Sequence, residues 1–128
     1  MASTFPCTLI TPERAVLERE ATFVAFPAID GEMGILAHRA PLLALLGAGE
    51  LRVESPAGRE RLFVAGGFAQ MVDNHLTLLT EEARPVAELD RAAAVRELEA
   101  ALGADSRDPE LRERSVAKAR AKLRLATG

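Results

Sequence analysis

Residues 51–64 read LRVESPAGRERLFV, and this stretch decides the fold. Apolar and charged side chains alternate from Leu51 to Glu54, which is the period of a strand with one buried face. Turn-forming residues follow at Ser55 to Gly58, and a second apolar run follows at 61–64. The pattern therefore predicts a β-hairpin.

Short apolar runs separated by turn residues continue on both sides of this hairpin, as far as residue 87. Asp73-Asn74 lies between two such runs and indicates a second tight hairpin. The links are too short for parallel crossovers, so we expect antiparallel sheets in a sandwich or a flattened barrel. The further apolar runs are at 5–10, 21–26, 67–72 and 75–79.

The apolar period changes from that of strands to that of helices in residues 88–128. Asp90 is a candidate N-cap, and apolar residues recur after it at Val95, Leu98 and Leu102. Asp108-Pro109-Glu110 is a typical helix start. A second stripe follows it, and its members are Leu111, Ser115, Ala119 and Leu123. Two alanine-rich helices with thin apolar stripes predict a weakly held αα-hairpin.

Composition and charge exclude several classes of protein. The 128 residues are 48% hydrophobic and 27% charged, which is ordinary for a globular chain. Cys7 is the single cysteine, so an internal disulfide and a cysteine-based zinc site are excluded; we expect it in the core. No run approaches the roughly 20 apolar residues of a membrane span. The first eleven residues lack the features of a secretory signal, so we expect a soluble, intracellular protein.

The net charge of −3 is divided unevenly along the chain. Residues 1–89 carry a net charge of −5, whereas residues 90–128 carry +2 and contain both lysines. The acidic first part and the lack of Tyr and Trp argue against binding to nucleic acid.

Catalytic patterns are absent from the sequence: there is no phosphate loop, no His-Glu-x-x-His and no Gly-x-Ser-x-Gly. We therefore predict no catalytic residues and no metal site. Gly66-Gly67 precedes a strand residue and indicates a tight strand junction rather than a nucleotide loop. His75, beside Asn74 in a hairpin, is expected on the surface.

Residues 30–42, DGEMGILAHRAPL, concentrate the unusual residue types of the chain. One interpretation is a loop with a bulge, whose glycines serve the backbone. The other is a rigid loop that presents Glu32 and His38 to a partner. Chemistry alone leaves both open.

These residues resemble the epsilon subunit of bacterial F-type ATP synthase, which corresponds to the mitochondrial delta subunit. The resemblance covers nearly the whole chain, and its most specific part is the run at 31–42 together with Gly66-Gly67-Phe68. The other matching stretches are 11–13, 49–53, 64–65, 74–79 and 89–90.

The resemblance implies a ten-strand antiparallel β-sandwich over residues 1–87 and a two-helix antiparallel hairpin over residues 88–128. It implies a central-stalk subunit that binds the gamma subunit and the c-ring and couples ring rotation to the catalytic head. The hairpin would extend to contact the beta subunit and block ATP hydrolysis. Such a protein is no enzyme itself and is peripheral, on the cytoplasmic side of the cell membrane through the complex.

Carried over by position, the resemblance places Glu32 and His38 at the c-ring contact. An exposed ion pair there is worth only about 0–1 kcal/mol, so Glu32 would fix register rather than supply affinity. The basic run of the second helix would contact the beta subunit, although a solvated helix face is the alternative. This basic run comprises Arg114, Lys118, Arg120, Lys122 and Arg124.

Some members of this family bind ATP on the folded hairpin through a Leu/Ile-Asp-x-x-Arg-Ala motif. Here Asp90 is present, and Arg120 and Arg124 match later arginines, but Ala93 and Arg84 stand where the motif has an arginine and an acid. Half of the site is missing, so we expect no nucleotide and no cofactor.

A different class of function stays open beside this one. The chain would then be a stand-alone β-sandwich that binds a small ligand, with the hairpin as a lid. Glu32, His38 and the loop glycines would form its pocket.

Overall fold

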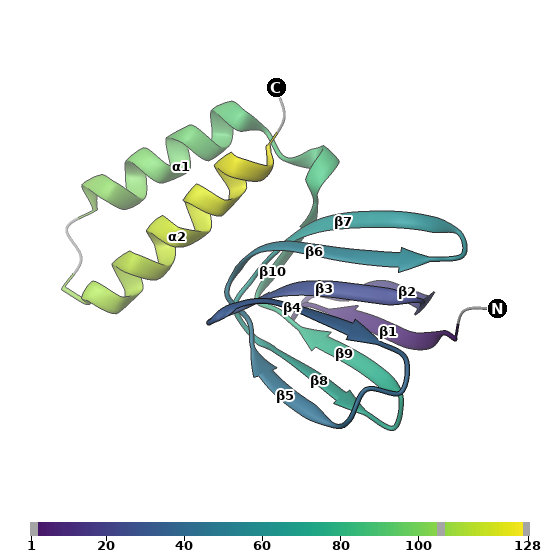
Figure 1. Ribbon diagram of the computed structural model, residues 1–128. Coiled ribbons are helices and arrows are strands. Elements are labelled where there is room, and N and C mark those ends of the chain that lie inside the picture. The colour runs from purple at the N-terminus through teal and green to yellow at the C-terminus, as the bar shows by residue number, and fades with distance from the viewer. Residues whose placement is uncertain (1–2, 105–106, 127–128) are drawn as a thin grey trace.

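The computed structural model describes residues 3–104 and 107–126, and it shows a two-sheet sandwich followed by two antiparallel helices (Figure 1). The predicted fold class, a ten-strand sandwich with a C-terminal helical hairpin, is confirmed. The two expected segments, 1–87 and 88–128, include a few residues outside the described ranges. These are residues 1–2, 105–106 and 127–128.

Each sheet has five strands. Sheet A has the order β2-β1-β9-β8-β5, and sheet B has the order β10-β7-β6-β3-β4. In sheet A the strands are β1 (Phe5–Ile10), β2 (Ala15–Ala21), β5 (Leu42–Leu45), β8 (Phe68–Val72) and β9 (His75–Leu79). In sheet B they are β3 (Phe23–Ala28), β4 (Gly31–Leu36), β6 (Ala48–Ser55), β7 (Gly58–Ala65) and β10 (Glu82–Pro85).

Both predicted hairpins are present. Strands β6 and β7 pair antiparallel up to Ser55 opposite Gly58, so Pro56-Ala57 forms a two-residue turn. Strands β8 and β9 pair up to Val72 opposite His75. Between them Asp73 and Asn74 have φ of 50° and 61°, the positive values that a type I′ turn requires.

The expectation that every strand pair would be antiparallel is wrong in one place. Strands β1 and β9 pair in parallel, with Cys7 opposite Leu76. Short links exclude a parallel pair only between strands that follow one another in the chain. Here the chain passes through the other sheet between the two strands, so the link is long enough.

The main core lies between the two sheets and is apolar. Its largest fully buried side chains include Phe5, Phe26, Ile35 and Met71. Cys7 belongs to this core, as predicted, at 1% exposed. Burial, with a smaller contribution from the charge of Glu60, raises the pKa of its thiol to about 12.

The two helices begin at the capping residues that the sequence indicates. Asp90 accepts a hydrogen bond from the backbone N–H of Ala92 and caps α1 (Arg91–Gly103). Asp108 accepts from Glu110 and Leu111 and caps α2 (Pro109–Leu125). A short 3₁₀ helix, η1 (Val86–Glu88), connects β10 to this hairpin.

The predicted apolar stripes are only partly correct. Val95, Leu102 and Leu111 are exposed, and Ala94 is the buried residue of α1. In α2 the buried residues are Val116, Ala119, Ala121 and Lys122. Small side chains let the helix axes approach closely, so alanines fill the contact and the longer apolar side chains lie at its rim.

Candidate functional site: a charge-free sheet face and an ion-paired helical hairpin

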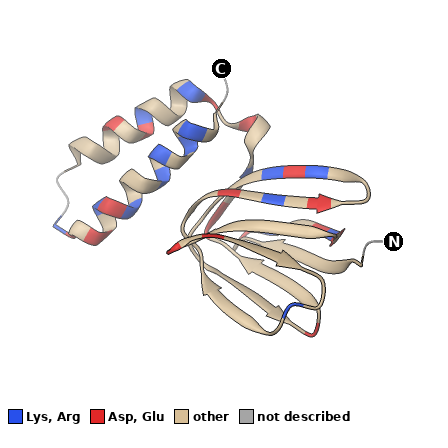
Figure 2. Ribbon diagram, in the orientation of Figure 1, with Lys and Arg blue, Asp and Glu red and all other residues tan. Residues whose placement is uncertain are grey.

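The outer face of sheet A carries no Lys, Arg, Asp or Glu along four adjacent strands. Strands β1, β9, β8 and β5 contain none of these residues, and Figure 2 shows them free of charge colouring. Several of their side chains are nevertheless exposed, among them Leu43 at 70% and Leu45 at 58%. An exposed apolar face of this kind is typical of a protein–protein docking surface. The other exposed members are Pro6, Gln70, Val72 and His75.

The outer face of sheet B has the opposite character, because β6 and β7 alternate acids and bases on it. Arg61 lies 2.5 Å from Glu50, and Arg59 lies 3.8 Å from Glu54. The two charges of each pair neutralise one another and stay partly solvated. This face is therefore less suited to binding an apolar partner surface.

The segment 30–42 is largely a strand rather than the loop that both interpretations assume. Gly31 to Leu36 form β4, an edge strand of sheet B that pairs with β3. Gly34 packs closely against β3, because a Cβ there would lie 3.0 Å from the ring of Phe23. Gly31, with φ of 133°, thus belongs to the turn before β4, and Gly34 allows β4 to pack beside Phe23.

Glu32 lies near the start of β4, beside the Asp30-Gly31 turn. Its carboxylate is 3.6 Å from Arg52 Nη1, and the Glu32 side chain is 59% exposed. Because a pair this open contributes little stability, Glu32 is free to exchange Arg52 for a cation on a partner.

His38 lies beyond the other end of β4 and has a left-handed backbone, with φ of 63°. Its N–H donates a hydrogen bond of 2.6 Å to Asn74 Oδ1 in the β8–β9 turn. A strand of this length spans about 20 Å, so the structure does not bring His38 and Glu32 together.

The predicted basic run of α2 divides between two environments. Lys118 and Lys122 face β10, whereas Arg120 and Arg124 are exposed. Arg114 lines a cleft at the end of the sandwich. The docked hairpin therefore presents only part of this run to solvent.

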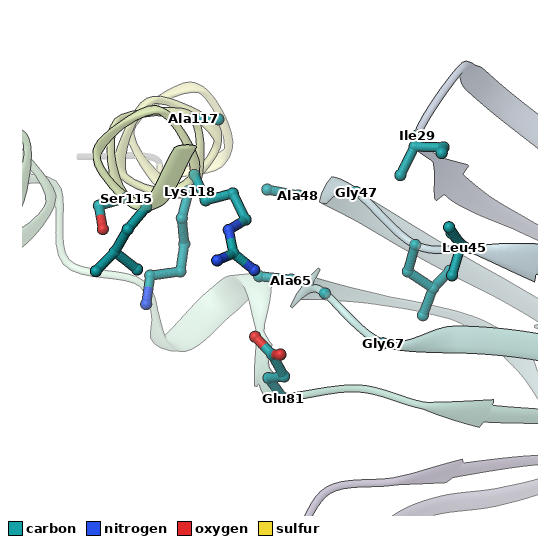
Figure 3. Close-up of a pocket in the computed structure, with 14 residues that line it drawn as sticks. Ile29, Leu45, Gly47, Ala48, Ala65, Gly67, Glu81, Ser115, Ala117 and Lys118 are labelled. Carbon is teal, nitrogen blue, oxygen red and sulfur yellow. The ribbon is translucent and has the colours of Figure 1, made fainter. Parts of the chain in front are cut away.

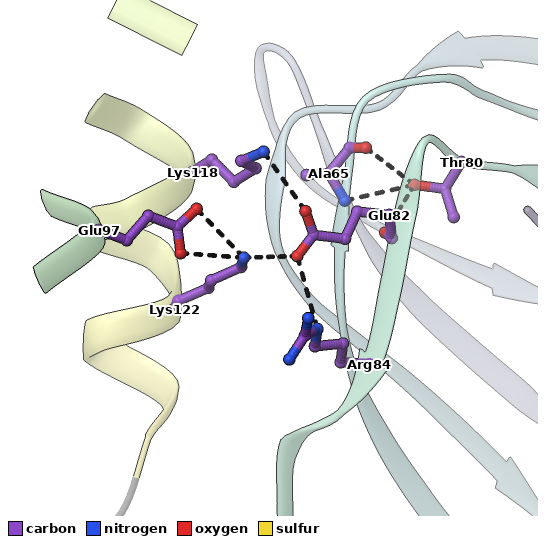
Figure 4. A network of polar contacts seen from close by, with 7 residues as sticks. All are labelled: Ala65, Thr80, Glu82, Arg84, Glu97, Lys118 and Lys122. Carbon is purple, nitrogen blue, oxygen red and sulfur yellow. Dashed lines mark hydrogen bonds and ion pairs between the residues drawn. The ribbon is translucent and has the colours of Figure 1, made fainter. Parts of the chain in front are cut away.

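Lys122 is the most buried charge in the described part of the chain, at 8% exposed. Its Nζ lies 2.5 Å from Glu82 Oε2 on β10 and 3.0 Å from Glu97 Oε2 on α1 (Figure 4). The ammonium also lies over the ring of Phe63, 5.3 Å from its centroid, a cation–π distance. One side chain thus joins α2 to both α1 and the sandwich.

Glu82 is the acidic centre of the same contact. Lys118 Nζ lies 3.3 Å from its other oxygen, and Arg84 Nε lies 3.8 Å from Oε2. Burial opposes ionisation of Glu82, but the nearby ammonium of Lys122, followed by that of Lys118, outweighs it, so its pKa is held below the ordinary value of 4.5. Its Oε2 is buried and meets the ammonium as an ion pair, without a well-directed hydrogen bond.

The three residues considered for a nucleotide occupy separate positions on the two helices. The Asp90 carboxylate is engaged as the cap of α1. Arg120 and Arg124 lie one turn apart on α2 and are exposed. Within the described residues, no hydrogen bond or ion pair joins Asp90 to either arginine.

An open cleft of about 630 Å³ separates α2 from the end of the sandwich (Figure 3). Its walls include Leu45 and Ala65 on the sandwich, and Arg114 and Lys118 on α2. Neither Glu32 nor His38 lines this cleft.

Across residues 3–104 and 107–126, no group of three or more His, Cys, Asp or Glu is arranged to hold a metal ion. In the same part of the chain, no helix combines the length and the apolarity needed to cross a bilayer.

Comparison with known proteins identifies the family. Residues 4–86 match the profile described as "ATP synthase, Delta/Epsilon chain, beta-sandwich domain". The ATP synthase epsilon chain of Rhodopirellula baltica is 46% identical over 123 residues, which cover 94% of this chain and 96% of the relative. The chain belongs to the ATP synthase delta/epsilon chain family. The resemblance seen in the sequence is therefore confirmed.

Two further proteins widen the comparison. The sodium-ion-specific epsilon chain of Propionigenium modestum is 35% identical, with 97% of this chain and 94% of the relative covered. In the Euglena gracilis mitochondrial ATP synthase, solved with OSCP, F1 and the c-ring, one chain superimposes with a TM-score of 0.77 at 26% identity. That match covers 94% of this chain and 78% of the other, so the similarity includes the hairpin.

Sequence reasoning missed two features that the structure adds to this delta/epsilon chain. The lack of charge in 5–10, 42–45, 68–72 and 75–79 is visible in the sequence, but only the topology shows that these strands are neighbours. The contact between Glu82 and Lys122 joins residues 40 positions apart and has no local signal.

Proposed function

We propose that the chain is a non-catalytic rotor subunit of the central stalk of a proton-translocating F-type ATP synthase. It couples rotation of the c-ring to the catalytic head, and its hairpin inhibits ATP hydrolysis. The observation that carries the proposal is the charge-free outer face of β1, β9, β8 and β5, four of the five strands of sheet A, in a member of the delta/epsilon family.

The gamma subunit is the partner proposed for the outer face of sheet A. A stalk contact that transmits torque must be stiff, and a flat apolar sheet face provides area without the desolvation of charges. Leu43 and Leu45 on the edge strand β5 are the most exposed apolar side chains of that face.

The c-ring is the partner proposed for the end of the sandwich that carries Glu32. The Glu32 carboxylate is open and weakly paired, so it suits a cation on a polar loop of the ring. His38, expected at the same ring contact, lies at the other end of β4, so it takes part only if the contact extends along this edge strand.

The hairpin is proposed as a brake that acts on the beta subunit. In the docked form Lys118 and Lys122 face Glu82, and only when the hairpin extends does the whole basic run become available to an acidic segment. The hairpin can switch between its docked and its extended position if the two differ by only a few kcal/mol in free energy.

In this proposal the chain catalyses no reaction itself, and it needs no cofactor. It is peripheral on the cytoplasmic side of the cell membrane and is held there through the complex.

The test is ATP hydrolysis by the reconstituted synthase. Replacing Arg114, Lys118, Arg120, Lys122 and Arg124 together by glutamine is expected to raise the hydrolysis rate, because the extended hairpin loses its charge. The matched control replaces five bases of the sandwich, Arg14, Arg19, Arg52, Arg59 and Arg61, and is expected to keep inhibition. Unchanged inhibition in the first variant argues against the brake.

A further inference from the structure

We propose that Lys122, Glu82 and Glu97 form an ionic latch that holds the hairpin on the sandwich and must open before the hairpin leaves. The latch itself is a property of this chain, whereas its effect on ATP hydrolysis rests on the function proposed above. No local sequence motif indicates it, because its members come from α2, β10 and α1.

The geometry makes Lys122 the centre of the latch. Its Nζ contacts one carboxylate on each side, at 2.5 Å to Glu82 and 3.0 Å to Glu97, and both distances are those of direct ion pairs. The side chain is 10% exposed, so water screens these pairs far less than it screens a surface pair. The helix cannot slide along the sheet without breaking at least one of them.

The lysines of α2 meet the carboxylate of Glu82 only while the hairpin is docked. Lys118 and Lys122 on α2 face Glu82 on β10, Glu97 adds a carboxylate from α1, and Arg84 lies at the edge. Removing one carboxylate leaves a nearly buried ammonium short of a partner, and such changes are strongly destabilising. The ionic contact therefore controls where and whether α2 docks.

The apolar part of the same interface is small. Its fully or nearly buried members are Phe63, Ala65 and Ala121, and Ala48, Leu89 and Leu125 pack against them partly buried. Because alanine buries little area, the apolar contact alone discriminates weakly between the docked and the released hairpin. The latch supplies the specificity that the apolar contact lacks.

The latch also explains why the docked and extended forms exclude one another. Lys118 and Lys122 are the only lysines in the sequence, and both are engaged by Glu82. An acidic partner must displace this carboxylate before it gains the two lysines. The carboxylates of the latch thus act as an internal competitor of an acidic partner.

Hydrogen exchange of α2 amides in the full-length chain tests the latch. Glu82→Gln is expected to raise the opening constant of α2 by roughly tenfold or more, while amides of the β6–β7 hairpin stay protected. The matched control is Glu81→Gln, the adjacent carboxylate, for which no ion pair is found among the described residues. Equal opening in the two variants, with the sandwich folded, overturns the proposal.

Lys122→Met keeps the latch testable if Glu82→Gln disturbs the strand. Methionine still packs on Phe63 but has no charge, so we expect a smaller increase in opening. In the double variant the two effects should be less than additive, because the pair is already broken. Strict additivity contradicts a direct pair.

Hydrolysis by the reconstituted synthase separates the latch from the brake. If Glu82→Gln opens the hairpin and lowers hydrolysis, both proposals are supported. If the hairpin opens and hydrolysis is unchanged, the latch stands and the brake fails. If the hairpin does not open, the latch fails whatever the hydrolysis rate.

Discussion

The backbone N–H of His38 and the side chain of Asn74 join two turns that lie 36 residues apart, through a hydrogen bond of 2.6 Å. Asn74 Nδ2 donates in addition to the carbonyl of Thr4, at 3.3 Å. One amide thus connects three segments at this end of the sandwich.

Asn74→Gly is expected to lower the free energy of unfolding by about 1–2 kcal/mol, because it keeps the positive φ but removes both hydrogen bonds. Urea denaturation followed by circular dichroism measures this, since the chain has no Trp or Tyr. The matched control is Asp73→Gly in the same turn, which is expected to be nearly neutral. Equal losses in the two variants would show that the amide bonds contribute nothing.

Gly67 is expected to be the least replaceable glycine of the chain. Its φ is 95°, and a Cβ there would lie 1.8 Å from the carbonyl oxygen of Leu79, so backbone must move. Gly67→Ala should cost at least about 2–3 kcal/mol of stability in the same denaturation experiment. Gly103→Ala, at a helix end with open space, should be neutral or stabilising by up to about 1 kcal/mol. A stable Gly67→Ala variant would contradict the strand-junction role.

The features that sequence reasoning predicted correctly are local ones. Alternation and turn residues fix the β6–β7 hairpin, and the caps Asp90 and Asp108 fix both helix starts, because each signal lies within a few residues. The parallel β1–β9 pair and the Glu82–Lys122 contact depend on the tertiary arrangement. Nothing within a strand or a helix turn specifies them, so they could not be predicted.

Cys7 is expected to be unreactive in the folded protein. Its thiol is buried, with its pKa raised from 9.0 to about 12, so almost no thiolate exists at neutral pH. Alkylation by iodoacetamide should proceed only as fast as the sandwich unfolds, and at full speed in urea. Stability should fall as the pH rises above 9.0, because only the unfolded thiol ionises there. Rapid alkylation of the folded chain would contradict the packing of β1.

Acid is expected to release the hairpin through Glu82. The pKa of this carboxyl is below 4.5 in the folded chain, so its stabilising contribution is complete above pH 4.5 and is lost as the pH falls through the folded pKa. Protease cleavage within α2 should therefore accelerate only below pH 4.5. In Glu82→Gln this acceleration should be reduced, because the variant lacks the carboxyl that titrates. An acceleration centred near neutral pH would identify a different group.

Glu32→Gln is expected to change the free energy of unfolding by less than about 0.5 kcal/mol, because its pair with Arg52 is exposed. In the reconstituted synthase the same change should lower proton-driven ATP synthesis while the chain stays bound. Glu54→Gln, at another partly exposed carboxylate of sheet B, serves as the control. Equal rates of ATP synthesis in the two variants would show that Glu32 does not contribute to the ring contact.

The most direct test of the central claim is the affinity of the full-length chain for the gamma subunit, measured by titration calorimetry. We predict a one-to-one complex that Leu43→Asp on sheet A weakens at least tenfold, because the complex buries an unpaired carboxylate. Leu36→Asp, on the outer face of sheet B and similarly exposed at 63%, should leave the affinity unchanged. No complex with the unmodified chain, or equal weakening by both substitutions, would contradict the account.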